Sequence, residues 1–122
     1  MGTICFVILN YKTWREAAAC AESILKTQQG QDIRIVLVDN GSGNGSEESL
    51  REEFAGEKRV HVIASEKNLG FARGNNLGIR YARSHFEPDF IVAANSDIIF
   101  EQEDYCEKLW EIYKDCLLYT SD

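Results

Sequence analysis

Three polar segments in this chain could bind a ligand, and each directly follows a short apolar run. They are Asn10-Tyr11 after residues 4–9, Asp39 after residues 33–38, and Asn95-Ser96-Asp97 after residues 90–94. A carboxylate such as Asp39 accepts hydrogen bonds from a ring N–H or from ribose hydroxyl groups. Oxygens from Asn95 and Asp97, two positions apart in an extended chain, can hold a hard divalent cation whose other ligands are diphosphate oxygens and water.

Each of these segments also has a purely structural explanation. Asp39 precedes a loop with glycines at 41, 43 and 45, and aspartate commonly organises such turns. Asn95 and Ser96 could cap the backbone that leads into residues 98–100. The residue types alone leave both explanations open.

A third feature is a row of glycines in a predicted helix. Gly70, Gly74 and Gly78 recur at four-residue intervals and share one strip of that helix, while Arg73 and Asn76 line an adjacent strip. Glycine costs about 0.5–1 kcal/mol per helical position relative to alanine, so something must approach this backbone closely. Either a ligand or tight packing of the helix on a sheet explains the pattern.

The elements that must position these residues alternate along the chain. Apolar runs rich in β-branched residues predict strands at 4–9, 33–38, 60–64 and 90–94, with a weaker one at 98–100. Between them lie helical patterns, with a capping box at Thr13 and Glu16, caps at Ser46 and Asn68, and an acidic start at 103–104.

This alternation predicts a fold class. Strands joined by helices over short connections give right-handed βαβ units, and hence a Rossmann-like α/β domain with about four parallel strands and helices on both faces. Ligands of such sheets bind beyond the carboxyl ends of the strands, where the polar segments fall. No linker or repeat divides the 122 residues, so residues 1–122 are expected to form a single domain.

Composition narrows the range of partners. The formal charge of −7 and a pI near 4.8 exclude a basic surface for a nucleic acid. No apolar stretch approaches the roughly 18 residues of a membrane span. The four cysteines, at 5, 20, 106 and 116, lack metal-site spacing and lie in apolar patterns, so we expect buried free thiols and a cytoplasmic location.

Together, four motifs resemble one known family. They are V-I-L-N-Y-K at residues 7–12, V-D-N-G-S-G-N-G-S at 38–46, N-L-G-F-A-R-G-N-N-L-G-I at 68–79 and A-N-S-D at 94–97. Their order and spacing over residues 3–115 resemble the nucleotide-sugar-binding half of family 2 glycosyltransferases with the GT-A fold. Within that family the chain looks most like the rhamnosyltransferase branch.

The resemblance implies roles for particular residues. Asp39 would bind the pyrimidine base, and Asp97 would bind Mg²⁺ or Mn²⁺ on the diphosphate. The remaining donor contacts that it implies are Leu9, Asn10 and Tyr11 in the nucleoside pocket, Asn95 and Ser96 at the ribose, and Arg73 and Asn76 facing the nucleotide. Asn95 stands where the family usually has a carboxylate, which should weaken metal binding.

The resemblance also implies a reaction and its partners. A sugar would pass from a UDP- or dTDP-sugar to a hydroxyl group of a saccharide or lipid-linked acceptor, with inversion at the anomeric carbon. The general base is expected in an acceptor-side half beyond these residues, so no catalytic residue is assigned here and the chain is expected to be a truncated enzyme. The full-length enzyme could be peripheral to the membrane. The alternative is a non-catalytic, nucleotide-binding fragment, or one that self-associates through an open sheet edge.

Overall fold

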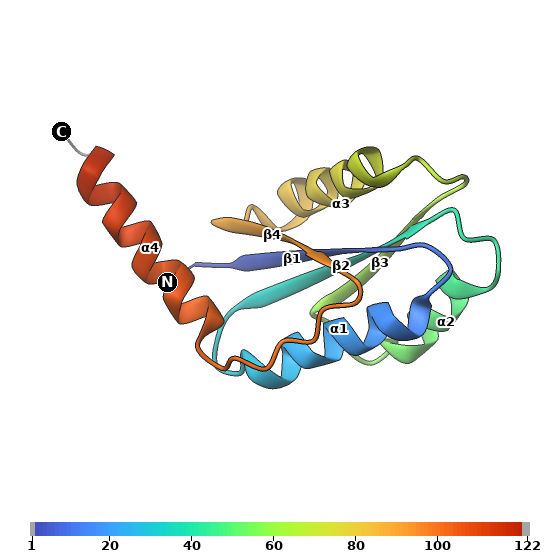
Figure 1. The fold of residues 1–122 in the computed structure, drawn as a ribbon, viewed down its shortest axis with the longest axis horizontal. Coiled ribbons are helices and arrows are strands. Elements are labelled where there is room, and N and C mark those ends of the chain that lie inside the picture. The colour runs from blue at the N-terminus through green and yellow to red at the C-terminus, as the bar shows by residue number, and fades with distance from the viewer. Residues whose placement is uncertain (1, 121–122) are drawn as a thin grey trace.

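The computed structural model describes the backbone of residues 2–120 and the side chains of residues 2–113, and has alternating strands and helices (Figure 1). In chain order these are β1 (Ile4–Asn10), α1 (Trp14–Thr27), β2 (Ile33–Asn40), α2 (Ser46–Glu53), β3 (Val60–Ser65), α3 (Phe71–Phe86), β4 (Phe90–Asn95) and α4 (Tyr105–Thr120). The four main predicted strands are confirmed. Each is one or two residues longer than its apolar run, because the polar residue that follows still pairs in the sheet.

The sheet is parallel, with strand order β3-β2-β1-β4. Helix α3 covers one face, whereas α1 and α2 cover the other (Figure 1). The predicted Rossmann-like α/β class is therefore confirmed. The register pairs Asn10 with Asp39 and Leu9 with Asn95, so the carboxyl ends of β1, β2 and β4 share one edge.

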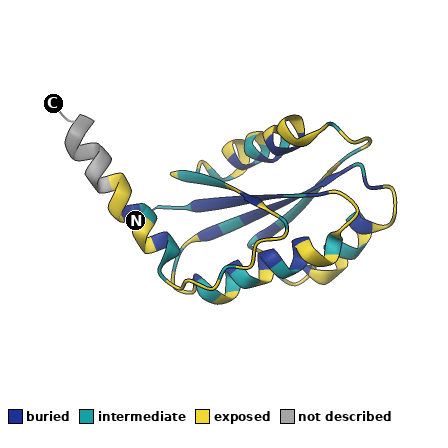
Figure 2. Cartoon of the chain, in the orientation of Figure 1, coloured by how far each residue is buried: buried dark blue, intermediate teal, exposed yellow. Residues whose placement is uncertain are grey.

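Two hydrophobic layers enclose the sheet (Figure 2). Phe6, Ile8 and Leu37 pack with α1 and with the start of α4, while Val7 and Val38 pack beneath α3. Successive side chains of a strand point to opposite faces, so a strand that is covered on both sides must be apolar at nearly every position. This double burial explains the continuous apolar runs that identify β1 and β2.

The helical glycines are explained by packing on the sheet. A Cβ atom at Gly78 would lie 2.5 Å from Val7 Cγ1 and 2.8 Å from Val38 Cγ2. A Cβ atom at Gly74 would lie 2.7 Å from Leu9 Cδ1. The close approach that glycine permits is thus made to β1 and β2, and Gly70 lies outside the helix, at its N-cap.

Three predicted helix starts are wrong in detail. Thr13 precedes α1 but makes no capping hydrogen bond with its side chain in the described structure, because its N–H and hydroxyl both donate to Asn10 Oδ1. Ser46 is the first residue of α2, and its N–H donates to Asn44 Oδ1 instead. Asn68 lies two residues before the N-cap of α3 and accepts from the N–H of Gly70.

Residues 98–100, predicted as a weak strand, are irregular. A turn follows β4, in which the N–H of Ile98 donates to the carbonyl of Asn95 over 3.1 Å. The N–H of Phe100 then donates to Ser23 Oγ on α1 over 2.8 Å. The hydroxyl of Ser23 on α1 therefore accepts from a backbone N–H that would pair with a neighbouring strand if residues 98–100 continued the sheet.

The described cysteines are buried free thiols, as predicted, at positions 5, 20 and 106, whereas the side chain of Cys116 lies outside the described residues. Burial raises the pKa of Cys5 to about 12 and of Cys106 to about 11. Within the described part of the chain, we find no helix that is long and apolar enough to cross a membrane.

The packing of α3 predicts the effect of a single methyl group. Replacing Gly78 with alanine should lower the free energy of unfolding by about 1–3 kcal/mol, because overpacking against Val7 and Val38 outweighs the gain in helix propensity. Urea denaturation measures the change. The control is Gly56→Ala, where an added Cβ meets open space and should change stability by less than about 0.5 kcal/mol. A Gly78→Ala protein as stable as the parent would contradict this packing.

Candidate functional site

Asp39 is held at the tip of β2 by two side chains. It is only 4 % exposed, and its Oδ1 accepts hydrogen bonds from Asn10 Nδ2 over 3.0 Å and from Ser42 Oγ. Ser42 Oγ in turn accepts from the N–H of Lys12 over 2.7 Å. For Oδ2 we find no hydrogen-bond partner among the described residues. The carboxylate is thus fixed through one oxygen, and the other is left for a ligand.

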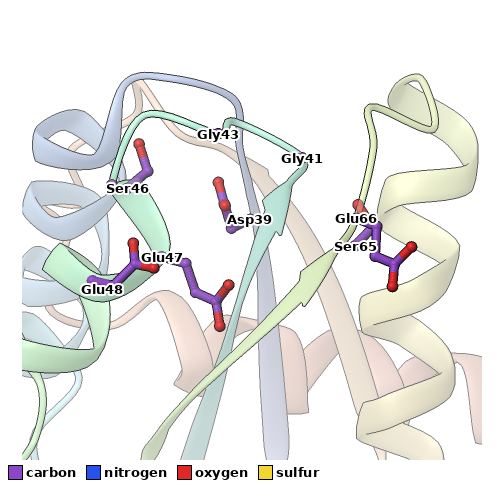
Figure 3. A pocket seen from close by; sticks show the side chains of 9 residues that line it. Asp39, Gly41, Gly43, Ser46, Glu47, Glu48, Ser65 and Glu66 are labelled. Carbon is purple, nitrogen blue, oxygen red and sulfur yellow. The ribbon is translucent and has the colours of Figure 1, made fainter.

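Asp39 opens into a cavity of about 540 Å³, which we call the β2 pocket (Figure 3). Its lining comes from the loop after β2, the first turn of α2 and the end of β3, and consists of Asp39, Gly41, Gly43, Gly45, Ser46, Glu47, Glu48, Ser65 and Glu66. All four charged residues in this lining are acids. Such a pocket favours N–H and hydroxyl donors over phosphate groups.

A second cavity of about 360 Å³ lies across the end of β1, and we call it the β4 pocket. Its lining consists of Leu9, Tyr11, Thr13, Glu16, Phe71, Ala94, Asn95, Ser96 and Asp97. Six of the nine residues from the predicted site line one of the two pockets: Asp39 the β2 pocket, and Leu9, Tyr11, Asn95, Ser96 and Asp97 the β4 pocket. Asp39 and Asp97 therefore lie at the same edge of the sheet but in separate cavities.

The extended path expected from Asn95 to Asp97 is wrong. Asn95 ends β4, and Ser96 and Asp97 lie in the turn that Ile98 closes. The carbonyl of Asn95 also accepts from the buried thiol of Cys20. Desolvation, and secondarily the charge of Asp97, raises the pKa of that thiol to about 11.

The other three predicted residues lie elsewhere. Asn10 is fully buried, and its amide donates to Asp39 while accepting from the N–H of Thr13, so it supports the site from below. Arg73 and Asn76 are exposed on α3 and belong to the lining of neither pocket. Their contact with a nucleotide stays a prediction.

Two functional candidates were missed by the sequence reasoning. Phe71 is 68 % exposed at the start of α3 and lines the β4 pocket beside Tyr11, which is 43 % exposed. An aromatic residue at the first position of a helix, directly after a glycine, was the available signal. Ser42 orients Asp39, and its position three residues after the acid is typical of a side chain that closes a turn.

The side-chain oxygens near the end of β4 suit a divalent cation that is held mainly by phosphate oxygens and water, with only one or two protein ligands. The side chains of Asn95 and Asp97 are exposed and line the same pocket. Within the described residues there is no group of three or more His, Cys, Asp or Glu side chains that could enclose a metal ion. One carboxylate and one amide oxygen fit Mg²⁺ or Mn²⁺, because such ions take one or two protein ligands and fill the rest with phosphate oxygens and water.

The support of Asp39 gives a testable prediction. Asn10→Ala should lower the free energy of unfolding by about 1–3 kcal/mol, because Asp39 loses a buried donor and the N–H of Thr13 loses its acceptor. Chemical denaturation measures this loss. Asn76→Ala, at an exposed position, is the matched control and should stay within about 0.5 kcal/mol of the parent. Equal stabilities of the two variants would contradict the role given to Asn10.

Comparison with solved structures identifies the fold. The chain superimposes with a TM-score of 0.74 and 16 % identity on Staphylococcus aureus TarS (residues 1–349) in complex with UDP-GlcNAc, covering 93 % of this chain and 31 % of that one. The mannosyltransferase PcManGT from Pyrobaculum calidifontis, solved with GDP-Man and Mn²⁺, gives a TM-score of 0.70 and 16 % identity over 83 % of this chain and 29 % of that one. These neighbours share the GT-A fold.

Sequence comparison leads to the same family. Glycosyltransferase GlyG of Streptococcus pneumoniae serotype 4 is 34 % identical over 88 % of this chain and 34 % of its own length. The putative glycosyltransferase EpsH of Bacillus subtilis is 30 % identical over 87 % of this chain and 29 % of its own length. The chain thus spans about a third of the length of these relatives. The model of Glycosyl transferase family 2 matches residues 5–117, and the chain therefore belongs to that family.

Proposed function

We propose that this chain is the donor-binding part of an enzyme that transfers a sugar from a UDP- or dTDP-sugar to an acceptor hydroxyl group. One observation carries the proposal: Asp39 lies at the carboxyl end of β2, and Asn95 and Asp97 lie at and just after the carboxyl end of β4, on either side of β1 and at the same edge of the sheet. Two interstrand spacings, or about 10 Å, separate the ends of β2 and β4. An elongated ligand lying across the tip of β1 reaches both.

The nucleoside belongs on the side of Asp39. The free Oδ2 oxygen accepts the ring N–H of a pyrimidine, while Oδ1 remains bound to Asn10 and Ser42. Because the carboxylate is held from below, it loses little freedom when it binds the base. This preorganisation supports base recognition by Asp39.

The diphosphate belongs on the side of Asp97. Asn95 and Asp97 would hold Mg²⁺ or Mn²⁺ there, and the bound ion would supply charge stabilisation to the departing diphosphate. The Mn²⁺ found with PcManGT supports this assignment. Asn95 contributes an oxygen without a charge, so the affinity for the ion should depend mainly on Asp97 and on the diphosphate.

The remaining features of the reaction rest on family membership. We expect inversion at the anomeric carbon and a saccharide or lipid-linked acceptor. Deprotonation of the attacking hydroxyl group needs a general base within hydrogen-bond reach, and we expect that base outside the matched segment. A rhamnosyl donor is one candidate, suggested by the four motifs at residues 7–12, 38–46, 68–79 and 94–97 taken together. The complexes of TarS with UDP-GlcNAc and with UDP support a uridine nucleotide. A cytoplasmic enzyme with access to a membrane surface fits such donors and acceptors.

Self-association is a second proposal, favoured by the sheet edges. Among the described strands, β3 pairs with β2 alone and β4 with β1 alone. An edge strand offers unpaired N–H and C=O groups to another chain. Light scattering at rising protein concentration should therefore reveal a dimer, and a molar mass that stays at 13.8 kDa would refute the proposal.

Calorimetry tests the proposed function directly. The parent chain should bind UDP or dTDP, and Mn²⁺ should tighten binding relative to EDTA by about tenfold, because the ion links the diphosphate to Asp97. Asp39→Asn should weaken nucleotide binding by about tenfold or more, both with Mn²⁺ and with EDTA, because an amide NH₂ donor replaces one of the two carboxylate oxygens. Asp97→Asn should abolish mainly the effect of Mn²⁺.

The control for these variants is Glu111→Gln, which removes an exposed acid on α4, remote from both pockets. Its affinity should equal that of the parent. No binding of either nucleotide at millimolar concentration would end the proposal, as would an Asp39→Asn protein that binds like the parent.

A further inference from the structure

The side chain of Asn40, directly after Asp39, points to the opposite face of the sheet and contacts residues 65–70. Asn40 is 3 % exposed, and because successive strand residues face opposite sides of the sheet, its side chain lies on the face covered by α3. The hydrogen-bond partners of its amide all belong to residues 65–70, the segment from the end of β3 to the start of α3. One residue thus ties two parts of the chain that are far apart in sequence.

Three of the four hydrogen-bonding positions of this amide are used. Nδ2 donates to Asn68 Oδ1 over 3.1 Å and to the carbonyl of Gly70 over 3.2 Å. Oδ1 accepts from the N–H of Leu69 over 3.0 Å, and Ser65 Oγ lies 3.4 Å away but gives its one hydrogen to the carbonyl of Lys67 over 2.8 Å. An asparagine amide has two donor hydrogens and two acceptor lone pairs, so residues 65–70 bind both donors and one lone pair. A buried network of this kind holds a single arrangement of the loop.

Two glycines let the backbones close around this amide. A Cβ atom at Gly41 would lie 2.2 Å from the backbone carbon of Lys67, and one at Gly74 would lie 3.0 Å from Asn40 Nδ2. The loop after β2 therefore rests directly on residues 67–68, and the second turn of α3 rests on the amide. Asn40 sits between them as the common contact.

The segment that Asn40 holds supplies walls to both pockets. Ser65 and Glu66 line the β2 pocket, and Phe71, directly after the segment, lines the β4 pocket. The other side of the same strand tip carries Asp39. A shift of residues 65–70 would therefore change the shape of both cavities while leaving the carboxylate of Asp39 on its own supports.

We propose that Asn40 is a positioning residue for the nucleotide-sugar donor, which sets residues 65–71 against both pockets without contacting the donor itself. This inference rests on the proposed function. Asn40, which follows Asp39 at the end of β2, would align the two halves of the site, the base side and the diphosphate side. A residue that served stability alone would leave the affinity of the folded protein unchanged.

The test compares Asn40→Asp with the parent by calorimetry against UMP and UDP with Mn²⁺, well below the melting temperature. The aspartate has the same shape, but its second oxygen faces Asn68 Oδ1 and the carbonyl of Gly70, which are both acceptors. We expect about tenfold weaker binding of UDP by the fully folded variant. Faster hydrogen exchange at the N–H groups of Leu69 and Gly70 should accompany the loss.

Two further variants keep the test decisive. Asn68→Ala changes an exposed side chain, should leave the fold intact, and should reproduce part of the loss, since it removes one acceptor of Asn40 and the acceptor of the Gly70 N–H. Gln29→Glu, which makes the same change from amide to carboxylate at an exposed residue that lines neither the β2 pocket nor the β4 pocket, is the control and should bind both nucleotides like the parent. A folded Asn40→Asp protein that binds UDP with the affinity of the parent would overturn the inference, whether or not its melting temperature is lower. Failure of the parent itself to bind would instead refute the proposed function.

Discussion

The arrangement of the site depends on the position of β1 in the centre of the sheet. Because β1 pairs in parallel with both β2 and β4, and because Asn10 is in register with Asp39 and Leu9 with Asn95, three polar strand ends emerge at one edge. A shift of one residue in either pairing would turn every side chain of a strand to the opposite face. Such a shift would also remove Val7 and Val38 from their close fit under Gly78 and separate Asn10 from Asp39, so these contacts favour the observed register.

The sequence predicts the layers of this fold well because the evidence for them is local. Continuous apolar runs indicate strands buried on both faces, and the helix after Thr13 is plain from its period. What it does not predict is competition for hydrogen bonds. The capping box of Thr13 and Glu16 does not form because Asn10 Oδ1 accepts from both the N–H and the hydroxyl of Thr13, and residues 98–100 do not join the sheet, since Ser23 accepts from the N–H of Phe100. Both partners lie on other elements.

The candidate site was predictable in part, and for a similar reason. The positions of Asp39 and Asp97 follow from strand ends, which the sequence marks clearly. The division into two cavities, the burial of Asn10 and the exposure of Phe71 depend on how loops and helix ends meet, and no local pattern encodes that. The glycines of α3 were ambiguous for the same reason, and the structure resolves Gly74 as a contact with Leu9 and Asn40 and Gly78 as a contact with Val7 and Val38.

The acidic lining of the β2 pocket has a consequence for the direction in which a ligand can lie. Four acidic residues line that cavity and only Glu47 of them is paired with a cation among the described residues, Arg51, so an anionic end brought there would meet repulsion, whereas a neutral ring with N–H and hydroxyl groups would not. A nucleotide sugar bound as proposed would thus have a preferred direction across the tip of β1, with its uncharged base at the Asp39 end. The reversed pose is disfavoured by electrostatics alone, before any contact with an acceptor.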